Sequence, residues 1–499
     1  GKIENWHKHT MFSTDMFPLF RQHGWRAPVE RNYLVAGLGF MLIEQCFEMY
    51  LNLRQRKYLK KDSLPKELTS LVEAIDQNKQ NVAAPKAQEI SREASSEDSK
   101  DTSLLGQLKA KFIKSQDYNL DKNGFSFLSM TYSMAMSATM LLSGFQVWLW
   151  TQAENVAVDT LGFDSSNELA ISSVFLIGSS LVGILMNIPI SLYSTFVIEA
   201  KHGFNKMTLG LFISDTLKNF VIESALTIPL MCGIIKLVRW GGETFWFYVW
   251  VLMVCFSLLM ITIYPNFIMP LFNEYKPLPD GELKSEIHSL AKRFEFPLTK
   301  LFEVDGSKRS SHSNAYLYGF FKDKRIVLYD TLIRNPDEPA LECTTGEILS
   351  ILAHELAHWK YSHVVKGFVF QNLMFLVGLK SYGYFMNDAD MYASFGFSDR
   401  PVVIGLNLFS YVLAPVGAVL GLVMNSMTRK FEYEADSFAA EHGKADGLRS
   451  GLCKISISNL ASFDVDPLYH MFHHSHPTLI QRLTAIDEQV SRSETKKTQ

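Results

Sequence analysis

The chain has 499 residues, of which 47% are hydrophobic, and its formal net charge is −3. A chain of this length can form two or three ordinary domains or one large membrane body. The near-neutral charge provides no overall basic field, which argues against a nucleic-acid-binding protein. The five cysteines are scattered and include no C-x-x-C pair, so neither a disulfide framework nor a cysteine-based metal site is expected.

Apolar residues gather in seven blocks that approach the roughly 20 residues needed to cross a bilayer as a helix. The predicted spans are residues 32–53, 126–150, 170–198, 219–238, 245–271, 365–386 and 401–427. The first block is the weakest, because Glu44 and Glu48 share a helix face that should look into protein or a wet cavity. A long amphipathic soluble helix is the alternative for that block. Residues 1–31 show no apolar run typical of a cleavable signal peptide, so the first span is expected to be an uncleaved anchor.

The loops between the blocks alternate in charge, which predicts the orientation of the spans. Five basic residues directly follow the first block, the loop before the third block has none, and three follow the third block. This pattern places residues 1–31 on the lumenal side and residues 54–125, with a flexible insertion at 83–103, in the cytosol. The C-terminus is then cytosolic, where Lys496 and Lys497 match a dilysine retrieval signal of the endoplasmic reticulum. A solvated basic tail is the alternative.

Two polar regions are expected to fold beside the spans. The first, 272–363, is predicted to contain a helix near 281–295 and then strands, of which SNAYLYGFF and RIVLYDTL should form a β-hairpin. A helix from about Thr345 follows. The second region, 428–490, is predicted to be mostly helical, within a C-terminal catalytic part that covers 428–499.

The first polar region ends in ILAHELAHWKYSH, which contains the pattern H-E-x-x-H. On a helix, His354 and His358 share one face one turn apart, so both imidazoles can reach one tetrahedral zinc ion. Glu355 lies about 100° round the helix and can accept the proton of a water that the metal activates. A chance occurrence in a chain of this composition has a probability of roughly 2%, so the pattern needs a third ligand to support it.

The segment TRKFEYEADSFAAEHG offers that ligand. Glu432 and Asp436 are four residues apart and share a helix face, whereas Glu434 points away from it. A glutamate ligand, with an aspartate that fixes a ligand imidazole through its other nitrogen, is the expected arrangement. A charged surface helix is the alternative. A metzincin is excluded, because no histidine follows His358 at the short spacing of that subclass.

The C-terminal region adds HMFHHSHPTLIQRL. Its cluster of His470, His473, His474 and His476 can bind metal or can be a solvated loop. His476 precedes a proline that favours the first turn of a helix, and it could donate to an oxyanion. Arg482, about two turns further on, could bind a carboxylate or a carbonyl group.

Taken together, the chain resembles the eukaryotic integral-membrane zinc CAAX prenyl protease family (type 1, a-factor-converting enzymes). The stretches SLYSTFVIEAKHGFNK, GSKRSSHSNAYLYGFFKDKRIVLYDTLI, ILAHELAHWKYSH, RKFEYEADSFA and HHSHPTLIQRLTAID carry the resemblance, which covers roughly residues 110–487. The pentapeptide departs from the usual H-E-L-G-H, because Ala357 replaces glycine. Alanine is the better helix former, so no loss of the site is expected.

The resemblance implies the roles of individual residues and a fold. It implies His354, His358 and Glu432 as ligands of one zinc ion per chain, Glu355 as general base and Asp436 as the outer partner of a ligand. It also implies His476 as an oxyanion-stabilising residue, with Asn314, Ala315 and Arg482 binding the substrate. The implied fold is mainly α and integral to the membrane: seven transmembrane helices form a barrel around a large chamber, with a zincin-like catalytic part that contains a small β-sheet.

The expected function is that of a zinc endopeptidase of the endoplasmic reticulum membrane, and of the inner nuclear membrane as a further location. It would remove the last three residues of prenylated proteins ending in Cys-a-a-X, with or without a second cleavage nearer the substrate's N-terminus. Its expected partners are these farnesylated or geranylgeranylated substrates and the lipid bilayer, and no nucleic acid. Two alternatives are a membrane quality-control protease, which would share the same catalytic residues, and a non-proteolytic scaffold. A transporter is disfavoured because no paired repeats with broken helices are found.

Overall fold

The computed structural model describes residues 32–87, 103–320, 323–334 and 338–498. The predictions for residues 1–31, and for most of the insertion 83–103, therefore lie outside the described residues. Seven of the described helices are long and apolar enough to cross a membrane, in agreement with the predicted number of spans. These are α2 (Asn32–Leu59), α4 (Leu104–Leu142), α6 (Glu168–Tyr193), α7 (Leu209–Trp240), α8 (Phe245–Ile263), α12 (His363–Phe385) and α14 (Val402–Ala439).

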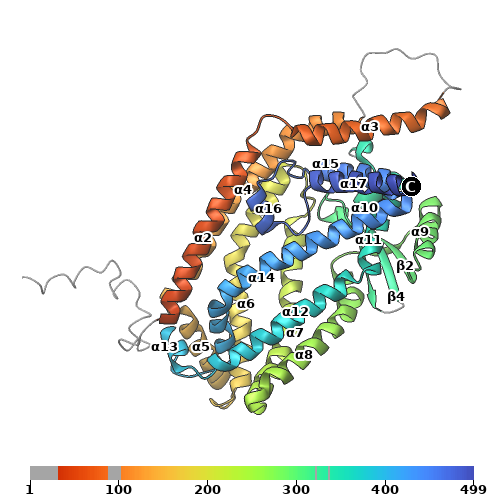
Figure 1. Ribbon diagram of the computed structural model, residues 1–499. Helices are drawn as coiled ribbons and strands as arrows, with labels where there is room; N and C mark the ends of the chain where they lie inside the picture. The colour runs from red at the N-terminus through yellow and green to blue at the C-terminus, as the bar shows by residue number, and fades with distance from the viewer. Residues whose placement is uncertain (1–31, 88–102, 321–322, 335–337, 499) are drawn as a thin grey trace, which may run out of the picture.

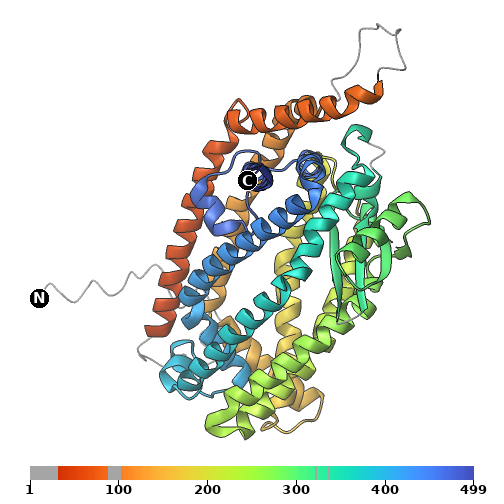
Figure 2. The ribbon, with the colours of Figure 1, turned by 45° about the vertical axis from the view of Figure 1, so that its right-hand side comes forward.

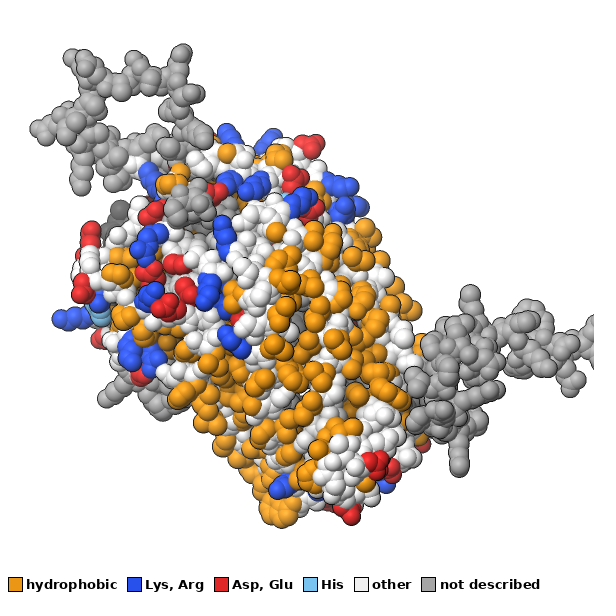
Figure 3. Space-filling model, turned by 180° about the vertical axis from the view of Figure 1, so that it is seen from behind, with side chains coloured by type: hydrophobic (Ala, Val, Ile, Leu, Met, Phe, Trp, Pro, Cys, Tyr) orange, Lys and Arg blue, Asp and Glu red, His pale blue; other side chains and the backbone are white. Residues whose placement is uncertain are grey.

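The seven helices run side by side along the long axis of the molecule (Figures 1 and 2). Seen from behind, their outer face is covered by hydrophobic side chains, and most charged side chains lie towards its ends (Figure 3). A broad apolar surface of this kind fits burial in lipid rather than exposure to water. The remaining helices are α3 (Lys66–Ala87), α5 (Phe145–Asn155), α9 (Glu282–Arg293), α10 (Asp330–Ile333), α11 (Thr345–Lys360), α13 (Ala389–Ser394), α15 (Ala445–Ser458), α16 (Pro467–His473) and α17 (Leu479–Thr498).

The boundaries of the second span differ from the prediction. Residues 126–150 cover the end of α4 and the start of α5, which are separated at Gly144, where φ is +66°. Glycine adopts this left-handed conformation readily, so it permits the break between the helices. Much of the predicted loop 54–125 is also helical, as α3 and the first half of α4. Their apolar residues, such as Leu68 and Leu108, pack against Ile457 of α15 and Leu483 of α17.

The last span and the helix expected after it are one continuous helix. α14 has 38 residues, and it carries both the apolar block that crosses the membrane and, near its end, Glu432 and Asp436. Because the helix is continuous, the position of its membrane part largely sets the position of these two carboxylates.

A four-stranded sheet lies beside the helical body, next to α9 and α11 (Figure 1). Its strands are β1 (Tyr275–Pro277), β2 (Leu298–Val304), β3 (Ala315–Phe320) and β4 (Asp323–Tyr329), in the order β1-β2-β4-β3. β3 and β4 form the predicted antiparallel hairpin, and β2 pairs with β4 in parallel. β3 is therefore an edge strand.

The sheet and α11 share one hydrophobic core. Ile326 and Leu328 of β4 are fully buried in a cluster with Ile348 and Leu352 of α11, which also includes Ala435 of α14. Burial of side chains of this size stabilises a fold by roughly 1.5–3 kcal/mol each. This core holds α11 between the sheet and the end of α14, and so brings the two predicted groups of metal ligands together.

Candidate metal centre

α11 begins with a strong start signal. The Thr344 hydroxyl accepts a hydrogen bond from the backbone N–H of Glu347, and the Glu347 carboxylate accepts one from the N–H of Thr344. This capping box satisfies two backbone donors that the first turn would otherwise leave free. The helix ends at Lys360, and Ser362, with φ of +55°, turns the chain directly into α12.

His354, His358 and Glu432 form the one group of possible metal ligands found in the described ranges of the chain. Nε2 of His354 lies 3.2 Å from Nε2 of His358. The two carboxylate oxygens of Glu432 lie 3.5 Å from Nε2 of His354 and 3.3 Å from Nε2 of His358. Each of the three residues offers one ligand atom, and these three atoms lie within 4.8 Å of one another, close enough to surround one metal ion.

The Glu432 carboxylate has a further property expected of a ligand. Its side chain is only 3% exposed, yet its Oε2 accepts no hydrogen bond within the part of the chain that the structure describes. His476 and Arg482 lie 3.0 and 3.6 Å from this oxygen, and a buried carboxylate is costly unless positive charge of this kind, or a metal ion, compensates it. The alternative of a charged surface helix therefore does not describe this end of α14.

Asp436 and Arg482 extend the group. Oδ1 of Asp436 lies 2.8 Å from Nδ1 of His354, on the side of the ring away from Glu432. The Arg482 guanidinium donates to both oxygens of Asp436, over 2.8 Å from Nε and 2.6 Å from the terminal nitrogen Nη2. Arg482 is thus paired with Asp436, and its Nη1 lies 3.6 Å from Oε2 of Glu432.

Glu355 is half-buried on α11 beside the ligands. Desolvation by the surrounding protein raises the pKa of its carboxyl group, although the neighbouring histidines and Arg482 act in the opposite direction. A raised pKa suits a group that accepts and then returns a proton near neutral pH.

The C-terminal histidines divide into two sets. His476 is 64% exposed, and its Nδ1 lies 3.0 Å from Oε2 of Glu432, so it stands at the edge of the metal group. His473 instead pairs with Glu48 of α2, with 3.1 Å between Nε2 and Oε2. His470 and His474 also lie outside the metal group. Glu48, an acidic residue within the first span, therefore has a protein partner, as expected for a charged residue on a membrane helix.

Asn314 and Ala315 stand at the start of the edge strand. The backbone N–H of Tyr329 donates to the carbonyl of Asn314, so residues 314, 316 and 318 bond to β4. In an antiparallel pair the alternate residues, 315, 317 and 319, then direct their backbone groups to the free edge. The N–H of Ala315 is held there by the side-chain oxygen of Asn314 at 2.8 Å.

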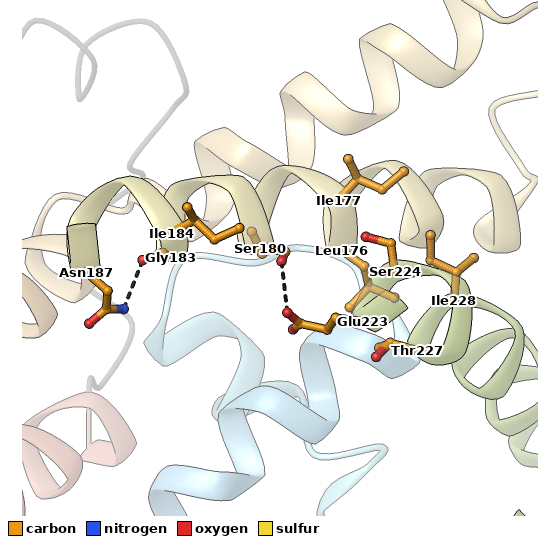
Figure 4. A pocket seen from close by; sticks show the side chains of 11 residues that line it. Leu176, Ile177, Ser180, Gly183, Ile184, Asn187, Glu223, Ser224, Thr227 and Ile228 are labelled. Carbon is orange, nitrogen blue, oxygen red and sulfur yellow. Dashed lines mark hydrogen bonds between the residues drawn. The ribbon is translucent and has the colours of Figure 1, made fainter. Parts of the chain in front are cut away.

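Three cavities with shared lining residues lead along α6 and α7 to this strand. The first, of about 490 Å³, lies between the two helices, where the Ser180 hydroxyl donates to Glu223 at 3.5 Å (Figure 4). The second, of about 210 Å³, shares Glu223 with the first and Asn219 with the third. The third, of about 500 Å³, has Tyr316 of β3 in its wall. Polar residues on membrane helices thus line a path to the sheet.

Sequence reasoning assigned no role to two residues near the ligands. Lys454 bonds to Glu347, the capping residue of α11, and His363 lies against His358. His363 could have been found from the sequence, because it is a further histidine only five residues after the last histidine of H-E-x-x-H. Lys454 gave no signal, because its partner lies 107 residues away in the sequence.

Two family models match the chain in succession. The model described as CAAX prenyl protease N-terminal, five membrane helices, matches residues 55–274, and the model of peptidase family M48 matches residues 277–490. A CAAX prenyl protease 1 homolog of Oryza sativa subsp. japonica is 40% identical over 463 residues, which are 93% of this chain and 99% of the relative. The chain belongs to peptidase family M48. It is therefore a multi-pass membrane metalloprotease.

Further members of the M48 family agree with this assignment. The CAAX prenyl protease 1 homolog of Homo sapiens is 36% identical over 495 residues, covering 93% of this chain and 97% of its own. The crystal structure of S. mikatae Ste24p matches with a TM-score of 0.77 and 33% identity, over 93% of this chain and all of that chain. The likeness confirms the predicted fold class of seven membrane helices with a small sheet.

Proposed function

We propose that the protein is a zinc-dependent endopeptidase that removes the C-terminal tripeptide from prenylated CAAX proteins. The observation that carries the proposal is the convergence of His354, His358 and Glu432 next to Glu355, in a chain related over nearly its full length to CAAX prenyl proteases. A second cleavage nearer the substrate's N-terminus remains a prediction from the family resemblance alone.

Zinc fits the three donors. In a tetrahedral site with bonds of about 2.0–2.1 Å, neighbouring ligand atoms lie about 3.3–3.4 Å apart. The two imidazole nitrogens lie 3.2 Å apart, and they lie 3.5 and 3.3 Å from Oε2 and Oε1 of the Glu432 carboxylate respectively, so the donors stand near that spacing. Two imidazoles and one carboxylate are also a common protein ligand set of a catalytic zinc site, which keeps the fourth position open.

The residues of the chain then have separable tasks. When bound, zinc supplies Lewis acidity, which makes water nucleophilic at neutral pH and polarises a carbonyl group. Glu355 accepts the proton of the attacking water and passes it to the departing amine. His476 donates a hydrogen bond to the oxygen of the scissile carbonyl as negative charge develops there. Asp436 holds the His354 ring in the tautomer that leaves Nε2 free.

The substrate is proposed to pair with the free edge of β3. An extended peptide that adds to this edge gains main-chain hydrogen bonds at residues 315 and 317, and Asn314 must release the N–H of Ala315 to allow it. The cavities along α6 and α7 offer a route by which a membrane-bound tail reaches this strand. In this arrangement the lipid bilayer delivers the substrate.

The decisive experiment uses purified full-length protein and a farnesylated CAAX peptide, with and without a chelator. We expect release of the tripeptide by protein that contains about one zinc ion, loss of cleavage with the chelator, and recovery on adding zinc. Glu355→Gln is the matched control, since it should retain zinc and lose cleavage. Chelator-insensitive cleavage, or none in zinc-loaded protein, would reject the proposal.

Location and orientation are also proposed. The charges of the loops favour a cytosolic C-terminus, and the membrane of the endoplasmic reticulum is the proposed location. Protease protection of a C-terminal tag in sealed microsomes tests the orientation. A tag protected from added protease would contradict it.

A further inference from the structure

His363 is buried directly behind the second histidine of the metal group. It is the first residue of α12 and is only 4% exposed. Its Nδ1 lies 3.0 Å from Nδ1 of His358, and its Nε2 lies 3.0 Å from Oε2 of Glu434. The ring stacks on Phe431, with centroids 4.2 Å apart and an angle of 7° between the planes. The imidazole is therefore held on two edges and one face.

The geometry of the metal group determines the direction of each hydrogen bond in this chain. Nε2 of His358 faces Glu432 and His354, so it must carry a lone pair when a metal is bound. The proton of His358 is then on Nδ1 and is donated to Nδ1 of His363. His363 consequently carries its own proton on Nε2 and donates it to the Glu434 carboxylate. Each of the four ring nitrogens and the carboxylate oxygen has one defined role.

The turn between α11 and α12 makes this contact possible. Ser362 has a φ of +55°, which folds the chain so that His363 comes back against His358 only five residues earlier. A non-glycine residue in this conformation is uncommon, and such strain persists where the surrounding structure holds it. Glu434 reaches the same place from α14, about 200° round that helix from Glu432.

We propose that His363 and Glu434 are positioning residues that fix the tautomer and orientation of His358. They would act on His358 as Asp436 acts on His354. Three acidic residues at alternate positions of α14 would then serve one centre: Glu432 as ligand, Asp436 behind the first histidine, and Glu434, through His363, behind the second. Partners of this kind typically contribute 10–100-fold to metal affinity or activity. The inference rests on the proposed metal site and does not depend on which peptide is cleaved.

The test measures zinc affinity of the purified full-length protein by competition with a chelator, together with the visible spectrum of the cobalt-substituted protein. His363→Phe keeps a ring that can stack on Phe431 but removes both nitrogens. We expect roughly 10–100-fold weaker zinc binding and an altered cobalt spectrum. On zinc-saturated protein, kcat should fall more than KM rises. His473→Phe, which changes a histidine outside the metal group, is the matched control and should bind zinc as the wild type does.

A second pair of variants separates positioning from general stability. Glu434→Leu removes the acceptor of His363, whereas Glu434→Gln keeps an oxygen that can accept the same hydrogen bond. We expect Leu to weaken zinc binding at least 10-fold and Gln to restore it to within about 3-fold of the wild type. If His363→Phe does not fold, the comparison of Glu434→Leu with Glu434→Gln still tests whether these residues position His358. Wild-type zinc affinity and cobalt spectrum in folded Glu434→Leu or His363→Phe protein would overturn the proposal, whether or not prenylated peptides are cleaved.

Discussion

The Lys454 ammonium lies 2.7 Å from the Glu347 carboxylate, and the two side chains are only 9% and 5% exposed. Lys454 belongs to α15, and Glu347 closes the capping box of α11 two turns before His354. The hydroxyl of Ser450 bonds to the same carboxylate, and Lys79 of α3 lies 3.1 Å from it. These contacts therefore tie the start of α11, the helix that carries His354 and His358, to α15 and α3.

Removing the lysine should destabilise the protein strongly. Lys454→Met leaves the Glu347 carboxylate buried with only the half-exposed Lys79 as a charged partner, and breaking a buried pair costs roughly 3–5 kcal/mol. We expect a clear fall of Tm in thermal unfolding. Lys284→Met is the control, because its partner Asp280 is 96% exposed, and such a surface pair contributes about 1 kcal/mol at most. Equal falls of Tm in the two variants would contradict the assigned role.

The same carboxylate should make stability depend on pH in the acid range. Burial opposes ionisation of Glu347, but the hydrogen bonds from Lys454, Ser450 and Thr344 outweigh it and lower its pKa to about 2. A group whose pKa is lower in the folded state stabilises the protein above its unfolded pKa of about 4.5 and loses that contribution as the pH falls towards 2. Between pH 5 and pH 3, the Tm of the wild type should fall more steeply than that of Glu347→Gln. Parallel curves for the two proteins would show that another group controls this range.

Local patterns predicted the parts of the fold that a single segment encodes. The four-residue spacing of His354 and His358 predicted a shared helix face, and the runs SNAYLYGFF and RIVLYDTL predicted the β3–β4 hairpin. The seven spans could be predicted from length and hydropathy, because a helix that crosses the bilayer must be both long enough and apolar enough on its own. The spacing of Glu432 and Asp436 made Glu432 a candidate third ligand and the family resemblance supported it, but no local spacing encodes the contact between α11 and α14.

Other features depend on tertiary contacts that leave no mark in a short window. The helices within 54–125 were predicted as a loop because their charged faces hide the apolar residues, such as Leu68, that pack on α15 and α17. Arg482 was predicted to bind substrate, but the prediction did not include its bidentate contact with Asp436. Glu434 was predicted to point away from the ligands, which is true of its helix face, yet His363 connects it to His358.

Substituting Arg482 by lysine should reduce activity despite the conserved charge. The guanidinium bonds both oxygens of Asp436 at once, and an ammonium group cannot reproduce this planar fork. Because Asp436, 2.8 Å from Nδ1 of His354, is proposed to orient that ring, we expect kcat to fall at least 10-fold with little change of KM. Kinetics on a farnesylated CAAX peptide provide the measurement. A rise of KM with unchanged kcat would instead support direct binding of substrate by Arg482.

Proline substitutions along β3 test where the substrate lies. The backbone N–H of Leu317 points to the free edge, whereas that of Tyr316 bonds to β4 in the hairpin ladder. Leu317→Pro removes the outward donor, and proline is tolerated in an edge strand when its missing N–H faces away from the sheet. We expect folded protein with normal zinc content and a KM for the prenylated peptide raised roughly 5–10-fold, as the loss of about 1 kcal/mol of hydrogen bonding implies. Tyr316→Pro is the contrasting variant, because it breaks the ladder and should lower Tm. Unchanged KM in folded Leu317→Pro protein would place the substrate away from this edge.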